Sequence, residues 1–131
     1  MHGSGGEKAT PEEERAEGNC ALVERAVDTG NCFVVEAHQQ VVGYAVLEYT
    51  FYAQGFISLL YIHPNYRGQG VGTMLVRYLE SVCQTPKLFT STNLSNVAMQ
   101  GLLVKLGYML SGVIHHLDQG DPELVFVKAL R

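Results

Sequence analysis

A glycine-rich turn constrains this chain more than any other feature of its sequence. The stretch HPNYRGQGVGTML, residues 63–75, follows the apolar run GFISLLYI and leads into a helical pattern. Pro64 ends the apolar run, because proline has no N–H with which to continue a central strand. No polar side chain stands at the start of the helix to cap it, so the turn presents bare backbone N–H groups. These groups need a partner.

Two of the well-known phosphate-binding patterns do not fit this turn. A P-loop requires a lysine before Thr73, and none is there. A dinucleotide-binding fingerprint counted from Gly68 requires a third glycine at position 73 and an acidic residue about 20 residues further on. This sequence has Thr73 instead of the glycine and no acid at that distance. What remains is Arg67 followed by three glycines at alternate positions, which lets converging N–H groups and the positive end of a helix bind a pyrophosphate. A plain strand-to-helix turn rich in glycine is the alternative.

Length and composition indicate one globular domain. The chain has 131 residues, with 47% hydrophobic and 17% charged residues. Its formal net charge of −4 gives no indication of a nucleic-acid or membrane partner, and it weakly favours a cationic substrate. The three cysteines have no metal-binding spacing, and no apolar segment has the length of a signal peptide or a membrane span. We therefore expect a cytoplasmic protein without a metal, with a disordered or tag-like segment 1–9 and a single domain 10–131.

The first half of the chain predicts a helix followed by an antiparallel meander. Thr10-Pro11 with Glu13 is a helix start, and the helical period resumes in CALVERAVDTGN until Gly30 or Asn31 ends it. Apolar runs at 32–37, 41–51 and 55–62 then predict three strands, of which the first two form a hairpin. No apolar first strand precedes Thr10.

The second half predicts alternating helices and strands. The helix after the glycine turn has an apolar stripe of Val71, Met74, Leu75, Tyr78, Leu79 and Val82. A short strand at 87–92 follows, then a helix capped by Ser95 or Asn93 and ended by Gly107, then strands within 108–117 and 123–130. Together these elements predict an α/β (α+β layered) domain, with a mixed, mostly antiparallel sheet and helices on both faces.

Two segments of the sequence resemble the GCN5-related N-acetyltransferase (GNAT) superfamily. LLYIHPNYRGQGVGTMLVRYLE is similar to the family's acetyl-CoA-binding motif, an apolar strand ending in V/I-x-P-x-x-R/Q-G-x-G-x-G before an amphipathic helix. NVAMQGLLVKLGY resembles the second motif, with Asn96, Gly107 and Tyr108 in register. The resemblance covers roughly residues 19–130 and implies the GNAT fold, in which two central strands splay apart around the cofactor.

The resemblance also implies which residues bind acetyl-CoA. The backbone of Leu60, Tyr61 and Ile62 would pair with the pantetheine arm, and one of these N–H groups would polarise the thioester carbonyl. Asn96 matches the asparagine with which the family contacts the cofactor from its later helix; a purely local hydrogen bond at a helix start is the alternative. The pyrophosphate would be held by the turn itself, through Arg67, Gly68, Gln69, Gly70, Val71, Gly72 and Thr73.

The family's usual catalytic residues are absent from the matching positions. Neither GFISLLYI nor KLFTST contains an acid, and the position of the family's tyrosine is Leu103. Glu48, acting through water, and Tyr61, beside the expected thioester, are the substitutes we predict for base and acid. As histidines, which ordinarily titrate near neutral pH, His63, His115 and His116 are suited to acid–base work, although paired histidines such as His115 and His116 are more often solvated turn residues. Catalysis by proximity alone is a further alternative.

The sequence thus predicts an acetyl-CoA-dependent N-acetyltransferase that acts on a primary amine, in a small or cationic molecule or in a peptide. A catalytically weak or inactive CoA-binding module, serving as a sensor or interaction protein, is the alternative. The family usually has an apolar first strand, and the sequence shows none ahead of Thr10. Either this edge is missing or a partner chain supplies it, and in the second case we expect a homodimer.

Overall fold

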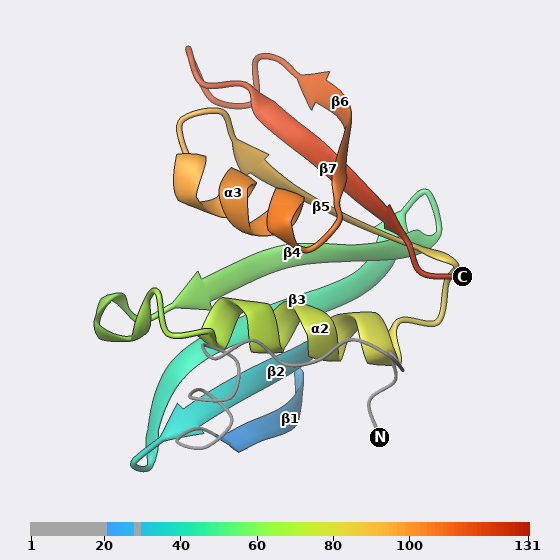
Figure 1. The fold of residues 1–131 in the computed structure, drawn as a ribbon. Helices are drawn as coiled ribbons and strands as arrows, with labels where there is room; N and C mark the ends of the chain where they lie inside the picture. Colours follow the sequence, from blue (N-terminus) through green and yellow to red (C-terminus); the bar gives the residue numbers. More distant parts are fainter. Residues whose placement is uncertain (1–20, 28–29) are drawn as a thin grey trace.

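A seven-stranded sheet runs through the molecule in the order β1-β2-β3-β4-β5-β7-β6 (Figure 1). The fold comes from a computed structural model that describes residues 21–27 and 30–131, with side chains from residue 32 onward. The strands are β1 (Ala21–Val27), β2 (Gly30–Ala37), β3 (Gln40–Phe51), β4 (Gln54–Ile62), β5 (Lys87–Asn93), β6 (Met109–Ile114) and β7 (Glu123–Ala129). The helices are η1 (Pro64–Tyr66), α2 (Val71–Val82) and α3 (Val97–Lys105).

The sheet consists of two antiparallel halves joined by one parallel contact. β1 to β4 form a meander, and β5, β7 and β6 form the second half. β4 and β5 meet in parallel over a short stretch, in which Gly55 to Ile57 face Leu88 to Thr90. The predicted mixed, mostly antiparallel sheet is therefore confirmed.

One prediction for the first half was wrong. Residues 21–27 form strand β1, paired with β2 from Ala21↔Glu36 to Val27↔Gly30, and not the continuation of a helix. The apolar residues Leu22, Val23 and Ala26 fit a helical stripe, but pairing with the long apolar β2 overrides so short a periodic signal. The predicted helix start at Thr10 and the segment 1–9 lie outside the described residues.

The two described α-helices, α2 and α3, pack on the same side of the sheet. α2 buries Val71, Leu75, Val76 and Leu79 against the meander, and α3 buries Leu103. These side chains belong to one core cluster with Phe33, Leu47 and Leu88 of the sheet, and Figure 1 shows α2 and α3 together in front of it. We expected helices on both faces of the sheet. Within the described residues, α-helices cover one face only.

Candidate functional site

The two halves of the sheet separate beyond Ile57 and form a fork between β4 and β5. The last paired residues are Ile57 and Thr90, and the buried Thr90 hydroxyl donates to the Ile57 carbonyl at 3.0 Å. At the closed end, the Gly55 N–H donates to the Thr85 hydroxyl at 2.9 Å. β4 has a bulge at Ser58, since Ile57 faces Leu47 and Leu59 faces Val46. A bulge bends its strand, so β4 turns away from β5 where the pairing ends.

The register of β4 decides which backbone groups face the fork. His63 N–H donates to Val42 O at 2.8 Å, which fixes the hydrogen-bonded pairs between β3 and β4. Because such pairs alternate along antiparallel strands, the Tyr61 backbone faces Tyr44 of β3, whereas Leu60 and Ile62 turn their N–H and C=O groups toward the fork. Of the three predicted backbone contacts, the geometry leaves Leu60 and Ile62 available.

The glycine turn folds back on the end of β4. Pro64 to Tyr66 form a single 3-10 turn, and the Arg67 N–H donates to the Pro64 carbonyl at 3.4 Å. The Arg67 Nε donates to the Ile62 carbonyl at 3.1 Å, at the open end of the fork. The Gln69 side-chain amide donates to the Asn65 carbonyl at 2.9 Å, so these side chains fasten the turn.

Helix α2 begins without a side-chain cap, as the sequence predicted. Its N-cap is Gly70, whose φ of 89° lies in the left-handed region that favours glycine. The first helical hydrogen bond runs from Met74 N–H to Gly70 O. The N–H groups of Val71, Gly72 and Thr73 therefore have no partner among the residues that the structure describes. Together with the positive end of the helix, they can bind an anion.

Close packing holds this helix start against the fork. A Cβ added at Gly43 of β3 would lie 3.1 Å from the Tyr61 carbonyl oxygen and 3.1 Å from a methyl of Val71. A Cβ at Gly72 would lie 3.3 Å from a methyl of Leu102 on α3. The absence of side chains at these two positions lets α2 approach β4 on one side and α3 on the other.

Asn96 lies at the start of α3 and caps that helix. Its Oδ1 accepts a hydrogen bond from Met99 N–H at 3.1 Å, so the alternative of a local hydrogen bond is present in the structure. The predicted caps Ser95 and Asn93 were wrong: both side chains instead bond Asp118 or Asp121 of the β6–β7 loop. Leu103 is 1% exposed and belongs to the core.

The two predicted catalytic side chains do not lie together. Tyr61 is 38% exposed and stacks on Tyr44, with 5.2 Å between the ring centroids. Glu48 faces Phe56, four residues further along β3 than Tyr44, which corresponds to roughly 13 Å along the strand. Hydrogen bonds from Ser58 and Thr50 hold the pKa of the Glu48 carboxyl below its ordinary value.

A second carboxylate lies across the fork and was not predicted. Glu123 of β7 accepts a hydrogen bond from the Ser91 hydroxyl of β5 at 2.7 Å. Thr90 and Thr92 are buried on the helix side, so the alternation of β5 places Ser91 on the opposite face. Glu48 likewise lies on that face, since its neighbours Leu47 and Tyr49 pack in the core. Glu123 follows a turn in the sequence and carries no motif, so only pairing with β5 reveals its position.

The three candidate histidines lie in two places: His63 at the glycine turn, and His115 and His116 in the β6–β7 loop. His63 accepts a hydrogen bond from Asn65 N–H through Nδ1, at 3.1 Å, and so caps the 3-10 turn. His115 and His116 are exposed and line an open pocket with Asp118 and Asp121 of the β6–β7 loop. Among the described residues, no group of three or more His, Cys, Asp or Glu side chains is arranged to hold a metal ion. No helix in the same part of the chain is long and apolar enough to cross a membrane.

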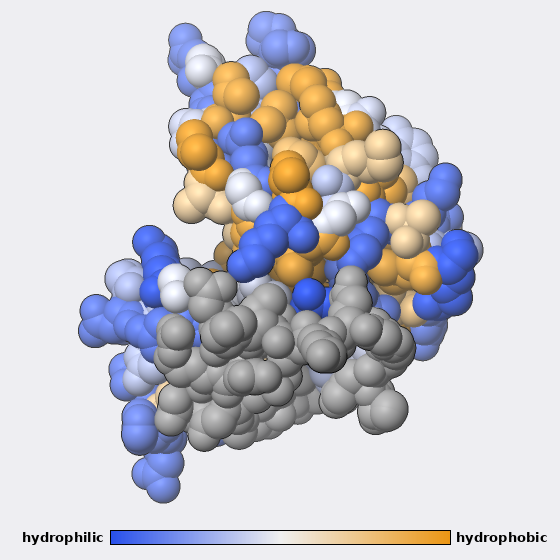
Figure 2. Space-filling view, viewed as in Figure 1, coloured by the Kyte–Doolittle hydropathy of each residue, from blue (hydrophilic) through white to orange (hydrophobic). Residues whose placement is uncertain are grey.

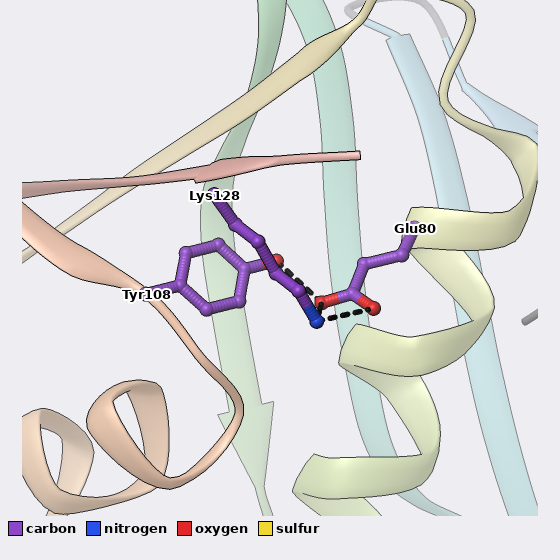
Figure 3. A network of polar contacts seen from close by, with 3 residues as sticks. All are labelled: Glu80, Tyr108 and Lys128. Carbon is purple, nitrogen blue, oxygen red and sulfur yellow. Dashed lines mark hydrogen bonds and ion pairs between the residues drawn. The ribbon is translucent and has the colours of Figure 1, made fainter. Parts of the chain in front are cut away.

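A polar network joins α2 to the second half of the sheet (Figure 3). The Tyr108 hydroxyl donates to a carboxylate oxygen of Glu80 at 2.9 Å, and the Lys128 ammonium lies 3.2 Å from both oxygens. The same ammonium lies 5.7 Å from the centre of the Tyr108 ring. Burial, together with the negative charge of Glu80, raises the pKa of Tyr108 well above its ordinary value. We call Glu80, Tyr108 and Lys128 the clasp.

Comparison with known proteins identifies relatives of this chain. Residues 5–108 match the model of the Acetyltransferase (GNAT) family. The chain is 35% identical over 66 residues to peptidyl-lysine N-acetyltransferase YjaB of Salmonella typhimurium, a match that covers 50% of this chain and 44% of the relative. The chain thus matches less than half the length of that curated relative.

Solved structures agree with this match. A GNAT-family acetyltransferase from Bacillus cereus is 34% identical, with a TM-score of 0.71 over 75% of this chain and 69% of that one. The fold also resembles a putative streptothricin acetyltransferase from Bacillus anthracis, solved in complex with acetyl coenzyme A. There the identity is 16% and the TM-score 0.71, over 85% of this chain and 84% of the other.

Proposed function

Because the chain belongs to the GNAT family of acetyltransferases, we propose that it transfers an acetyl group from acetyl-CoA to a primary amine. The observation that carries this proposal is the fork between β4 and β5, with the uncapped start of α2 at its open end. The fork leaves backbone N–H and C=O groups of β4 without a strand partner, and the uncapped start of α2 leaves backbone N–H groups without an acceptor. Acetyl-CoA has complementary parts, a polyamide arm and a pyrophosphate.

The described residues fit acetyl-CoA by their hydrogen-bonding groups. The free N–H groups of Val71, Gly72 and Thr73 would hold the pyrophosphate, with no side chain at Gly70 to obstruct it. The N–H and C=O groups of Leu60 and the N–H of Ile62 would pair with the pantetheine arm in place of β5, because the Ile62 carbonyl already accepts from Arg67 Nε. When bound, the cofactor supplies an activated thioester.

The reaction joins the amine nitrogen to the acetyl carbon and breaks the bond from that carbon to sulfur. An N–H of Leu60 or Ile62 would stabilise the negative charge that develops on the carbonyl oxygen. An alkylammonium with a pKa near ~10 must first lose a proton. Glu48 and Glu123 are the carboxylates on the face of the fork away from the helices, and we assign the base to one of them, acting through water. Tyr61 remains the proposed acid toward the leaving thiolate.

The acceptor that this chemistry favours is a cationic amine. The carboxylates of Glu48 and Glu123 lie on one face at the fork, and the chain carries a net charge of −4. The match to a peptidyl-lysine N-acetyltransferase supports a lysine side chain as one such acceptor. A small polyamine or aminoglycoside-like amine has the same chemistry.

A second candidate is a CoA-binding module of weak or absent activity. The position of the family's tyrosine holds Leu103, which is buried in the core at 1% exposure, and the described β4 and β5 contain no acid. Binding would then be retained without efficient proton transfer.

The test is release of CoA thiol from acetyl-CoA against a panel of amines that includes a lysine peptide and a polyamine. Saturable turnover that falls at least tenfold in Glu48→Gln or Glu123→Gln, but not in the control Glu36→Gln at a half-buried position of β2, supports the enzyme. Calorimetric binding of CoA without turnover on any amine favours the module. Absence of both binding and turnover contradicts both candidates.

A further inference from the structure

We propose that the free edge of β6 pairs antiparallel with the same edge of a second copy of this chain, so that the protein forms a symmetric dimer. β6 pairs with β7 on one side only and ends the sheet. This proposal does not rest on acetyl transfer, because no residue of β6 takes part in the reaction proposed above.

The edge strand exposes apolar side chains on both of its faces. Met109 is 67% exposed, Leu110 55%, Val113 43% and Ile114 39%. No described helix covers them, and Figure 2 shows apolar surface over the part of the molecule where Figure 1 draws β6 and α3. We call these four side chains the edge patch.

The edge patch lacks the charged and proline residues that often protect an edge strand. Between Lys105 and Asp118 the sequence contains no Asp, Glu, Lys, Arg or Pro, whereas exposed edges usually carry a charge or a proline. From the exposed fractions, the four side chains together present on the order of 400 Å² of apolar surface, divided between the two faces of the strand.

The properties of the strand favour a second copy over another partner. An uncharged strand meets its own copy without like-charge repulsion, although each chain carries a net charge of −4. Antiparallel pairing about a two-fold axis is self-complementary. With the axis between Ser111 and Gly112, Met109 would face Ile114 of the second copy and Leu110 would face Val113, so each apolar side chain would find an apolar partner.

The bulge and the size of the patch fit the same arrangement. Ser111 is the extra residue in the pairing of β6 with β7, and it would lie at the axis, where Ser and Gly leave room for the additional twist. The patch supplies about half of the roughly 800 Å² per partner that a stable interface buries. We therefore expect a dimer in the micromolar range whose population depends on concentration.

The first experiment measures molar mass by light scattering from low to high micromolar concentration. The wild-type chain is expected to shift from monomer to dimer. Val113→Lys should abolish the shift, because each lysine would face the apolar Leu110 of the second copy, while Val41→Lys, at a residue of similar exposure (44%) on β3, should not. Circular dichroism confirms that both variants are folded. A chain that stays monomeric throughout would leave the edge to another kind of partner and overturn the proposal, as would a dimer unaffected by Val113→Lys.

A second experiment tests the register by disulfide trapping. Leu110→Cys/Val113→Cys places both cysteines in facing positions, whereas the control Met109→Cys/Val113→Cys is out of register by one residue. Oxidation should give covalent dimers at least several-fold faster in the first variant. Equal rates in the two variants, or faster trapping in the control, would contradict the antiparallel pairing.

Discussion

The Tyr108 hydroxyl donates a 2.9 Å hydrogen bond to the carboxylate of Glu80, 28 residues earlier in the chain. This bond crosses from α2, which packs on the meander, to the segment that enters the second half of the sheet. β4 and β5 pair only between Gly55 and Ile57, so elsewhere the two halves are held by side chains of the shared core and by this network. The clasp therefore helps to hold the fork at a defined width while one side remains open.

Removal of the clasp carboxylate should destabilise the fold. Glu80→Ala leaves the buried Tyr108 hydroxyl and the partly buried Lys128 ammonium without their partner, which should cost about 2–3 kcal/mol of unfolding free energy. Urea denaturation measures this change. The control Ser81→Ala, at the exposed neighbouring position, should change the free energy by less than about 0.5 kcal/mol. Equal effects of the two substitutions would show that the clasp does not stabilise the fold.

The clasp should also give stability a dependence on alkaline pH. Burial and the Glu80 charge raise the pKa of Tyr108 in the folded chain above its ordinary value of 10.0. The folded state therefore keeps a proton that the unfolded chain releases, and the stabilisation is complete below pH 10 and declines as the pH rises further. Tyr108→Phe lacks this titration. Its free-energy deficit relative to wild type should shrink by about 1 kcal/mol between pH 8 and pH 11; a constant deficit would be inconsistent with a raised pKa.

Gly43 should control how closely α2 approaches β4. In Gly43→Ala the new methyl would press on the Tyr61 carbonyl and on Val71, at 3.1 Å from each. We expect a loss of about 1–3 kcal/mol in stability and weaker CoA binding, because the start of α2 is displaced. Gly101→Ala on α3 is the matched control, since its Cβ would meet nothing within 4 Å. If both variants bind CoA like the wild type, the packing at Gly43 does not position the site.

Glu48, if it is the base, should leave a signature in the pH profile. Ser58 and Thr50 hold its pKa below the ordinary value of 4.5, so the carboxylate persists to low pH. Thr50→Ala removes one of these hydrogen bonds and should raise the pKa, which moves the acid limb of kcat/KM to higher pH. An acid limb that responds to Ser91→Ala instead would assign the base to Glu123, because Ser91 donates to that carboxylate.

Local sequence signals predicted most of the elements but not the long-range contacts. The hairpin strands, the stripe of α2 and the uncapped helix start follow from residues within one element, and all are confirmed. β1 was mistaken for a helix because seven residues with Leu22, Val23 and Ala26 fit either period, and pairing with β2 decided the outcome. Glu80 and Glu123 resemble ordinary surface acids in the sequence. Their partners Tyr108, Lys128 and Ser91 are 28, 48 and 32 residues away, and only the fold brings them together.

The most direct test of the account is calorimetric binding of CoA to the wild-type chain and to Gly70→Asp, with pantetheine as the control ligand. The new carboxylate would stand where the free N–H groups of α2 receive the pyrophosphate. We predict that CoA binds the wild type and loses at least a hundredfold in affinity for Gly70→Asp, while pantetheine, which has no pyrophosphate, binds both chains equally. Unchanged CoA affinity in a folded Gly70→Asp variant would contradict the placement of acetyl-CoA at the start of α2.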